Sequence, residues 1–182
     1  MKSIILHADI EDIEVRSHYS SNYMMPGFHY HDAYEIYALE AGHREYMVNN
    51  TFIKLEERDV VLIKPSMRHC FLSGEYTASS IHFSKGFMKK YFTDLFIERF
   101  TKCFDKEVIR VRSSDFNVLI SLIEKLYENS DDCMSFMQLF ILLDNNMDRV
   151  TKNYKKENHA LYNIIDYINE NYKYISSLFI NS

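Results

Sequence analysis

The sequence predicts a mainly β fold with C-terminal helices, in which a small barrel precedes the helical part. Between Phe28 and Phe83 the apolar residues come in short runs separated by turn residues, a pattern typical of a sandwich or barrel. After Gly86 they recur at helical spacing. A chain of 182 residues is long enough for one domain of ordinary size with an appendage.

The first half of the chain supplies the expected strands, at residues 34–39, 45–48, 51–55, 60–63 and 79–83, with a further short strand at 108–111. Turns are expected at 41–43, 49–50, 56–59 and 64–66. Asn49-Asn50 predicts a two-residue hairpin turn, because asparagine tolerates the left-handed conformation that such turns require. Residues 60–63 are wholly apolar, which predicts a fully buried strand.

The second half supplies helices. A short helix is expected within 87–104, and a longer one follows Ser113 and Ser114, which we expect to cap it. This longer helix has an amphipathic stripe of Phe116, Leu119, Ile120, Ile123 and Leu126. The next helix, about 134–150, is apolar almost all round and must be covered on more than one side. The first helix or the barrel covers one side, and a second subunit is expected on the other.

Composition and charge exclude several classes of protein. A hydrophobic content of 47% with 26% charged residues is globular rather than disordered. The net charge of -5 argues against a free-standing nucleic-acid binder. Three cysteines without a Cys-x-x-Cys pair indicate a reducing compartment. The apolar runs are too short for a signal peptide or a membrane span, so we expect a cytoplasmic protein without membrane contact.

The run Phe28-His29-Tyr30-His31-Asp32-Ala33-Tyr34-Glu35 is the most informative segment. Side chains alternate along a strand with period two, so His29, His31 and Glu35 share one face of an extended segment. We expect all three to point into the barrel. Imidazole and carboxylate groups in one interior can hold a metal ion or a polar ligand.

The pattern His29-x-His31-x3-Glu35-x6-Gly42 resembles the first motif of the cupin superfamily. Asp59, Pro65 and His69 resemble its second motif, in which Arg58 stands where the family usually has glycine. The turn at Arg58 must therefore adopt its shape without the freedom of glycine. Residues 28–71 together with 81–83 are similar to the N-terminal sensor domain of bacterial AraC/XylS-type transcription regulators.

This resemblance implies a domain plan. Residues 1–112 would form a cupin-like ligand-sensing barrel, a double-stranded β-helix of the jelly-roll type, and 113–150 a helical hairpin through which a homodimer forms. Residues 151–158 would be a linker, and 159–182 the first helix of a truncated helix-turn-helix DNA-binding domain. Because both recognition helices are missing, DNA contacts of the parent protein are expected only through the missing C-terminal domain.

The resemblance also implies a ligand set. His29, His31, Glu35 and His69 would bind one divalent transition metal (Zn, Ni, Fe, Cu or Mn), each imidazole needing an acceptor on its other nitrogen. Without a metal, the same residues would line a pocket for an anionic or hydroxylated small-molecule effector. Further candidates for ligand binding are Tyr37, Tyr46, Arg68 and His82, where Arg68 could supply a fork for a carboxylate or phosphate. A solvated arginine and barrel-stabilising tyrosines are the alternative reading.

Three functions follow from these expectations. The first is a non-enzymatic sensor and dimerisation region of a transcription regulator. The second is a small metal-dependent cupin enzyme, an isomerase, decarboxylase or dioxygenase, which needs an open metal position and a general acid or base. The third is a dimer scaffold without a ligand, whose barrel is filled by tyrosine, phenylalanine and methionine side chains.

Overall fold

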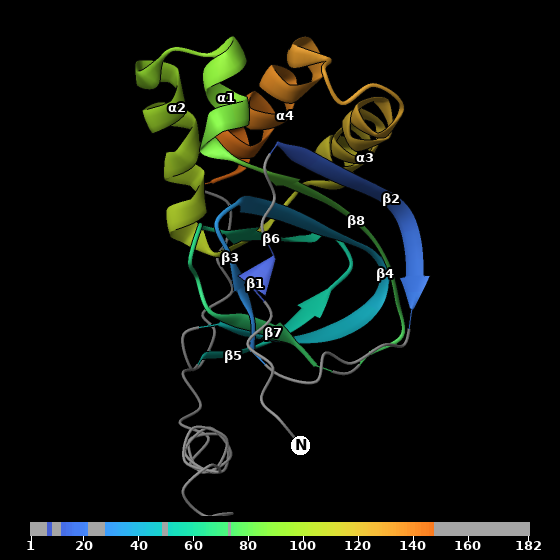
Figure 1. Cartoon of the computed structure of the whole chain (residues 1–182). Helices are drawn as coiled ribbons and strands as arrows, with labels where there is room; N and C mark the ends of the chain where they lie inside the picture. Colours follow the sequence, from blue (N-terminus) through green and yellow to red (C-terminus); the bar gives the residue numbers. More distant parts are fainter. Residues whose placement is uncertain (1–6, 9–11, 22–27, 49–50, 73, 148–182) are drawn as a thin grey trace, which may run out of the picture.

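The computed structural model describes residues 7–8, 12–21, 28–48, 51–72 and 74–147 (Figure 1). The strands are β1 (His7–Ala8), β2 (Ile13–Ser21), β3 (Tyr30–His31), β4 (Tyr34–Val48), β5 (Thr51–Glu56), β6 (Asp59–Ile63), β7 (His69–Phe71), β8 (Tyr76–Phe83) and β9 (Val108–Arg110). The helices are α1 (Lys85–Tyr91), α2 (Asp94–Thr101), the 3-10 helix η1 (Lys102–Lys106), α3 (Ser113–Glu128) and α4 (Cys133–Asn146). The predicted fold class, mainly β with C-terminal helices, is confirmed.

Strand β4 organises the sheet. The strand order is β2-β8-β4-β6-β9, all antiparallel, and β5 and β7 pair with the second half of β4. The first half of β4 pairs with β6 and β8. One long strand therefore belongs to both walls of the barrel, which curve around the interior in Figure 1.

The turn expected at residues 41–43 is wrong, because β4 runs through it as one strand. Gly42 has a φ of 83°, and the pairing with β8 shifts register between Leu39 and Ala41. Glycine takes this conformation without steric cost. A side chain here would collide with the carbonyl oxygen of Glu75. The strand therefore bends at Gly42 and continues, instead of reversing.

Other expected strands are confirmed. Val48 and Thr51 are partners in antiparallel register, so β4 and β5 form the predicted hairpin, although residues 49–50 lie outside the described part. Strand β6 is buried at every position. Strand β2, which the sequence analysis did not predict, covers the edge of β8.

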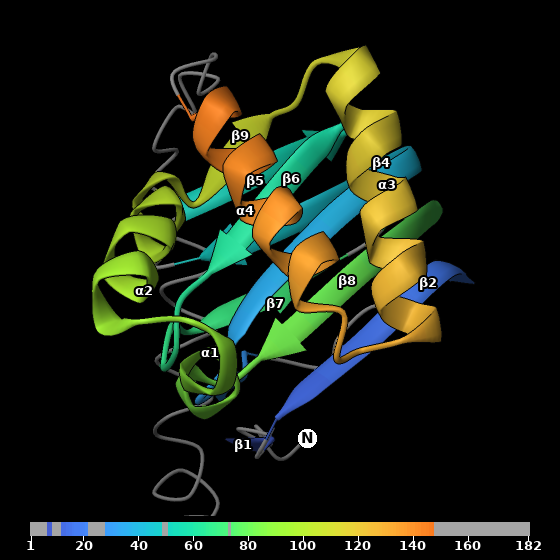
Figure 2. The same ribbon diagram turned by 90° about the horizontal axis from the view of Figure 1, so that it is seen from above.

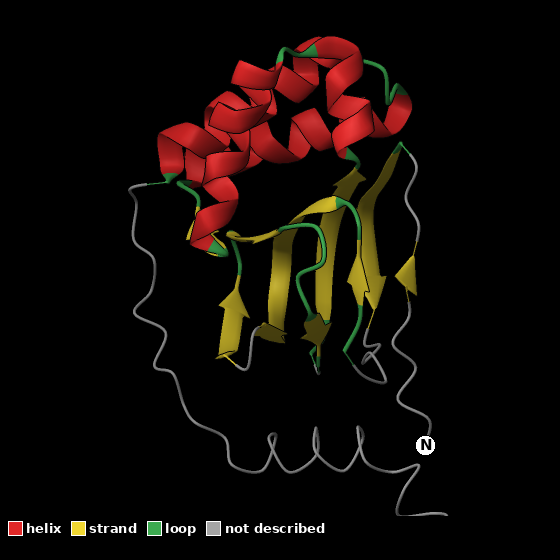
Figure 3. Ribbon diagram, turned by 60° about the vertical axis from the view of Figure 1, so that its left-hand side comes forward, coloured by secondary structure: helices red, strands yellow, loops and turns green. Residues whose placement is uncertain are grey.

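The helices form a layer over one side of the sheet (Figures 2 and 3). Aromatic side chains fill the space between: the Phe83 ring packs edge-to-face against Phe136 at 5.0 Å and against Phe140 at 5.7 Å. The inner side of α4 is thus buried on the barrel, as expected. No helix in the described ranges is long and apolar enough to cross a membrane.

The helix starts differ in detail from the prediction. Ser113 and Ser114 lie inside α3, whose N-cap is Arg112 in an extended conformation. Helix α4 is capped by Asp132, whose carboxylate accepts hydrogen bonds from the backbone of Met134 and Ser135. The expected linker at 151–158 and the helix at 159–182 lie outside the described residues.

Candidate metal centre

Four imidazoles and one carboxylate meet inside the barrel. His31 lies on β3, Glu35 on β4, His69 on β7 and His82 on β8, while His29 precedes β3 and forms an isolated backbone bridge with His69. The Glu35 Oε2 atom lies 3.1 Å from Nε2 of His31, 3.5 Å from Nε2 of His69 and 3.3 Å from Nε2 of His82. We call these five residues the histidine–glutamate cluster.

The cluster is buried. Relative exposures are 2% for His31, 4% for Glu35 and 0% for His69. The ring of His29 lies 4.0 Å from that of His69, centroid to centroid. Two overlapping groups of three, His29–His31–His69 and His31–Glu35–His82, each offer ligand atoms within 4.8 Å of one another.

The expectation that His29, His31 and Glu35 extend from one strand is wrong in its local detail. A bend at Asp32 and Ala33 separates β3 from β4. A hydrogen bond stabilises the bend, in which Nδ1–H of His31 donates to the carbonyl oxygen of Ala33 at 2.8 Å. The three side chains still converge, since the bend turns β3 back toward the start of β4.

Hydrogen bonds to the backbone fix which ring nitrogen carries a hydrogen in two of the imidazoles. Nδ1 of His31 faces the carbonyl oxygen of Ala33, and Nδ1 of His69 faces that of Met67, both at 2.8 Å. A carbonyl oxygen only accepts, so both Nδ1 atoms carry hydrogen. In the neutral ring the Nε2 lone pair then points inward. These carbonyls are the acceptors that a metal-binding imidazole requires on its other nitrogen.

Charge in the cluster centres on Glu35. Burial alone would raise the pKa of Glu35, but the charge of His82, followed by the neighbouring imidazoles of His31 and His69, holds it well below its usual value. Burial would likewise lower the pKa of His82, yet the Glu35 carboxylate raises it. Burial, followed by the neighbouring His69, lowers the pKa of His29 to about 4. Glu35 is therefore ionised and His29 neutral at pH 7.

The donor set fits a divalent transition metal. Neutral imidazole nitrogens and a carboxylate oxygen are ligands of zinc, nickel, iron, copper and manganese. Nε2 of His31 lies 3.1 Å and Nε2 of His69 lies 3.5 Å from Oε2 of Glu35, and a cation that replaced a proton between them would be bound by all three groups. The residues therefore fit the metal that the cupin resemblance implies.

The remaining predicted residues lie at different places. Tyr37 and Tyr46 are fully buried in the barrel, and the Tyr46 ring lies 6.3 Å from that of His69. Within the described residues the Tyr46 hydroxyl has no hydrogen-bond partner. Arg68 stacks on Phe28, with its guanidinium carbon 4.5 Å from the ring centroid. Of the eight predicted residues, the structure brings His29, His31, Glu35, His69 and His82 together.

Arg44 is an interior residue that sequence reasoning missed. Its guanidinium lies between the rings of Phe71 and Tyr76, 4.3 Å and 3.8 Å from their centroids, and donates to the Tyr37 hydroxyl at 3.1 Å. The aromatic faces stabilise the buried charge. Arg44 and Tyr46 stand two residues apart on β4, so strand alternation could have placed Arg44 inside the barrel with Tyr46. Both have even numbers whereas Glu35 and Tyr37 have odd numbers, because the strand is irregular between Leu39 and Ala41.

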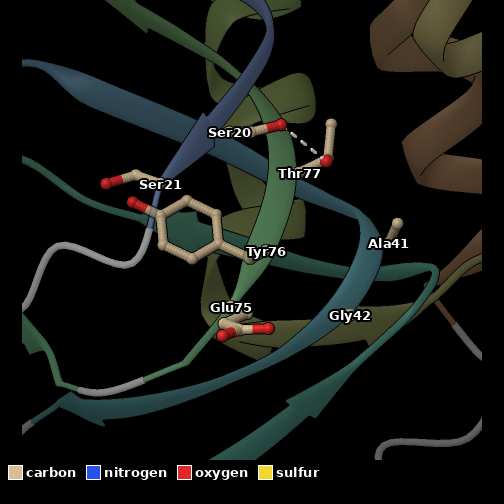
Figure 4. A pocket seen from close by; sticks show the side chains of 7 residues that line it. All are labelled: Ser20, Ser21, Ala41, Gly42, Glu75, Tyr76 and Thr77. Atoms are coloured by element: carbon tan, nitrogen blue, oxygen red, sulfur yellow. Dashed lines mark hydrogen bonds between the residues drawn. The ribbon is translucent and has the colours of Figure 1, made fainter.

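A surface pocket lies elsewhere, at the bend of β4 beside the ends of β2 and β8 (Figure 4). Its volume is about 570 Å³. Two of the residues that line it, Ser20 and Thr77, are joined by a hydrogen bond of 2.8 Å between their hydroxyls. None of the eight predicted site residues lines it, so the candidate site is the buried cluster.

The model of the AraC-like ligand binding domain matches residues 12–150, which is most of the chain. The chain belongs to this family. It is therefore a ligand-sensing regulatory domain, and the family points to a sensor rather than to an enzyme. The match includes every member of the histidine–glutamate cluster and helices α3 and α4.

Several solved structures are similar to this AraC-like domain. A cupin protein from Bacteroides fragilis is 21% identical with a TM-score of 0.36, covering 42% of this chain and 70% of that one. ToxT from Vibrio cholerae, with a bound unsaturated fatty acid, is 16% identical with a TM-score of 0.46, covering 75% of this chain and 54% of that one. The AraC-like transcriptional activator CuxR is 9% identical with a TM-score of 0.45, covering 77% of this chain and 51% of that one.

This chain therefore matches about half the length of the two regulators. No curated protein sequence matches it. The predicted membership of the AraC/XylS sensor family and the cupin-like barrel with C-terminal helices are confirmed.

Proposed function

We propose that this domain is the effector-sensing and dimerisation region of an AraC-type transcription regulator, and that a divalent transition-metal ion binds the histidine–glutamate cluster. The parent protein is a sequence-specific DNA-binding factor in this proposal. Its DNA contacts come from a helix-turn-helix domain that would start near residue 159. The family match supports the sensing role, and the chemistry of the cluster supports the metal.

One observation carries the metal proposal. Two buried imidazoles, His31 and His69, have their Nδ1 hydrogens committed to backbone carbonyls and present Nε2 to the same carboxylate oxygen. An ion bound there would accept these lone pairs and neutralise the buried charge of Glu35. Burying polar groups without such compensation is costly.

A small organic effector with oxygen groups is the second occupant that the interior supports. The Tyr46 hydroxyl is buried without a hydrogen-bond partner among the described residues, and a ligand oxygen could accept its hydrogen. Burial, with the charge of Glu35 adding to it, raises the pKa of Tyr46 well above its usual value. The hydroxyl therefore stays a neutral donor across the physiological range.

Dimerisation through α3 and α4 is supported by the apolar residues on their outer faces. Val118 on α3 and Ile141 on α4 are 52% and 48% exposed. Both line a groove of about 330 Å³ between the two helices. A bound effector that stabilises one conformation of the barrel would alter how these helices are presented, because ligands shift populations by differential affinity.

Metal titration tests the proposal. Zn²⁺ or Ni²⁺ is added to chelator-treated protein in a calorimeter. We expect one tight site in the wild type and in the His43→Ala control, whose imidazole is exposed on β4. The His31→Ala variant should lose this site. A flat titration of the wild type would refute the metal and leave the organic effector.

A further inference from the structure

We propose that His18 forms a proton-dependent bridge between the barrel and helix α3, which is closed while the imidazole is charged and releases Glu124 when the imidazole is neutral. The bridge consists of His18 on β2, Glu40 on β4 and Glu124 on α3. Helix α3 also carries Val118, which lines the groove of the proposed dimer. An effect of pH on dimerisation therefore rests on the proposed function, whereas the bridge itself does not.

The contacts of His18 require a charged imidazole. Its Nδ1 lies 2.6 Å from Oε2 of Glu40, and its Nε2 lies 2.6 Å from Oε1 of Glu124. Carboxylate oxygens only accept hydrogen bonds, so both ring nitrogens must carry hydrogen, as they do only in the imidazolium ion. A neutral imidazole would direct a lone pair at one of the two carboxylates. Only the charged ring can therefore hold both of them at once.

The backbone places the His18 ring between the sheet and the helix. His18 has a φ of 49°, and the pairing of β2 with β8 shifts register between Arg16 and Tyr19. The backbone N–H of His18 donates to the Ser79 hydroxyl at 2.9 Å. Because a left-handed conformation is unfavourable for a residue with a side chain, these contacts must hold His18 in it. In Figure 2, α3 lies over β2 and β8, so the ring of His18 reaches the helix from the irregular part of β2.

The two carboxylates are held unequally. The Glu40 side chain is 14% exposed and also accepts a hydrogen bond of 2.5 Å from the Ser79 hydroxyl. The Glu124 side chain is 48% exposed and can turn to water. Loss of the proton from His18 should therefore release Glu124 and leave Glu40 bound to Ser79.

Other charged groups beside the bridge offset one another. Glu57 and Arg58, in the turn between β5 and β6, line the same hollow of about 510 Å³ as Glu40 and Glu124. They contribute one charge of each sign, so the two carboxylates of the bridge dominate. The pKa of His18 is raised accordingly, first by the hydrogen bond to Glu124 and then by Glu40, although burial lowers it.

Release of Glu124 should not detach the helix. Leu119 and Ile123 of α3 are fully buried in the core that the helices share with the sheet. An exposed ion pair shifts an equilibrium by up to about five-fold. We therefore expect the proton on His18 to bias the position of α3 on the barrel, without unfolding it.

The first measurement follows the imidazole of His18 by NMR in metal-free protein. Its signal is the one that is absent from His18→Asn, a substitution chosen because asparagine tolerates the left-handed backbone. We expect the titration midpoint to lie above about 6.5, the ordinary value for histidine. The midpoint should fall in Glu124→Gln and stay unchanged in Glu128→Gln. A midpoint at or below the ordinary value, or one that Glu124→Gln leaves unchanged, would overturn the inference.

The second measurement reports on α3. The chain has no tryptophan, so Tyr127→Trp places a single indole on the last turn of α3, at a position that is 64% exposed. Its emission should change with pH at the midpoint of His18. Adding His18→Asn should remove this change, whereas adding His43→Ala, which removes an exposed imidazole of β4, should retain it. Emission that does not depend on pH, or a dependence that persists with His18→Asn, contradicts the bridge.

Circular dichroism checks that each variant is folded. If His18→Asn is unfolded, Glu124→Gln takes its place, because it removes the charge on the other side of the same contact. Neither measurement needs a metal ion or a dimer. A protein that binds no metal or stays monomeric would refute the proposed function without affecting these two results, so the two failures are distinguished.

Discussion

The imidazole of His18, on β2, lies between two carboxylates: its Nε2 is 2.6 Å from Oε1 of Glu124 on α3, and its Nδ1 is 2.6 Å from Oε2 of Glu40 on β4. His18 has a φ of 49° at the irregular point of β2. The Glu40 carboxylate also accepts a hydrogen bond of 2.5 Å from Ser79 on β8. His18 thus connects the two strands that carry Glu35 and His82 to a helix of the proposed dimerisation hairpin.

This link predicts a pH-dependent stability. The hydrogen bond to Glu124 is the largest cause that raises the pKa of His18, and Glu40 adds to it. A raised pKa in the folded state contributes stability that is complete below about pH 6.5, the unfolded value, and is lost as pH rises through the folded value. Because the pair is half exposed, we expect Glu124→Gln to cost at most about 1 kcal/mol at pH 6 and nothing at pH 9.

Urea denaturation at the two pH values measures this cost. Glu128→Gln, an exposed carboxylate of the same helix, is the control and should show no loss at either pH. Equal losses for Glu124→Gln at pH 6 and pH 9 would contradict the assignment of a charged link.

Substitution of Gly42 should destabilise the barrel. The φ of 83° and the collision of any side chain with the Glu75 carbonyl act together. We expect Gly42→Ala to lower the free energy of unfolding by about 2 kcal/mol or more. The control is Gly86→Ala in α1, where the added methyl meets only the Ser84 hydroxyl at 3.4 Å. It should be neutral or slightly stabilising in a denaturant titration.

Arg58 predicts the opposite change. It has a φ of 72° in the turn between β5 and β6, the position where the cupin motif usually has glycine. A left-handed conformation costs an L-residue about 1–2 kcal/mol, partly offset by the entropy that glycine loses on folding. Arg58→Gly should therefore raise the midpoint of thermal unfolding. A lowered midpoint would show that the Arg58 side chain contributes more than its backbone strain removes.

The two buried tyrosines should respond differently to loss of the hydroxyl. Tyr37 accepts a hydrogen bond from Arg44, whereas the Tyr46 hydroxyl has no partner among the described residues. We expect Tyr37→Phe to cost about 1 kcal/mol and Tyr46→Phe to cost less than about 0.5 kcal/mol in metal-free protein. Chemical denaturation of both variants measures the difference, and a larger loss for Tyr46→Phe would reveal a bond to the Tyr46 hydroxyl.

The proposed dimer predicts a charge-sensitive face. Ile141→Asp places a carboxylate in the groove between α3 and α4, and light scattering at high concentration should change from dimer to monomer. Leu95→Asp on α2, where Leu95 is 76% exposed, is the matched control and should remain dimeric. A monomeric wild type would exclude the interface, and a monomeric Leu95→Asp variant would move it to α2.

Local patterns in the sequence were sufficient for the fold class and for most of the cluster. Alternation and turn residues predict strands because both act over a few neighbouring residues. The spacing of His29, His31 and Glu35 identified the right segment even though a bend interrupts it. Strand β2 and the small β1 and β7 were missed, because their formation depends on pairing partners distant in the chain.

The amino-acid sequence was therefore enough to predict a barrel followed by helices, and an interior rich in histidine. Tertiary structure decided that β4 continues through Gly42, that Arg44 is inside, and that His82 lies beside Glu35. The physical reason is the same in each case. Register between strands, and the close approach of one backbone to another, are set by contacts between segments far apart in sequence, and no local spacing encodes them.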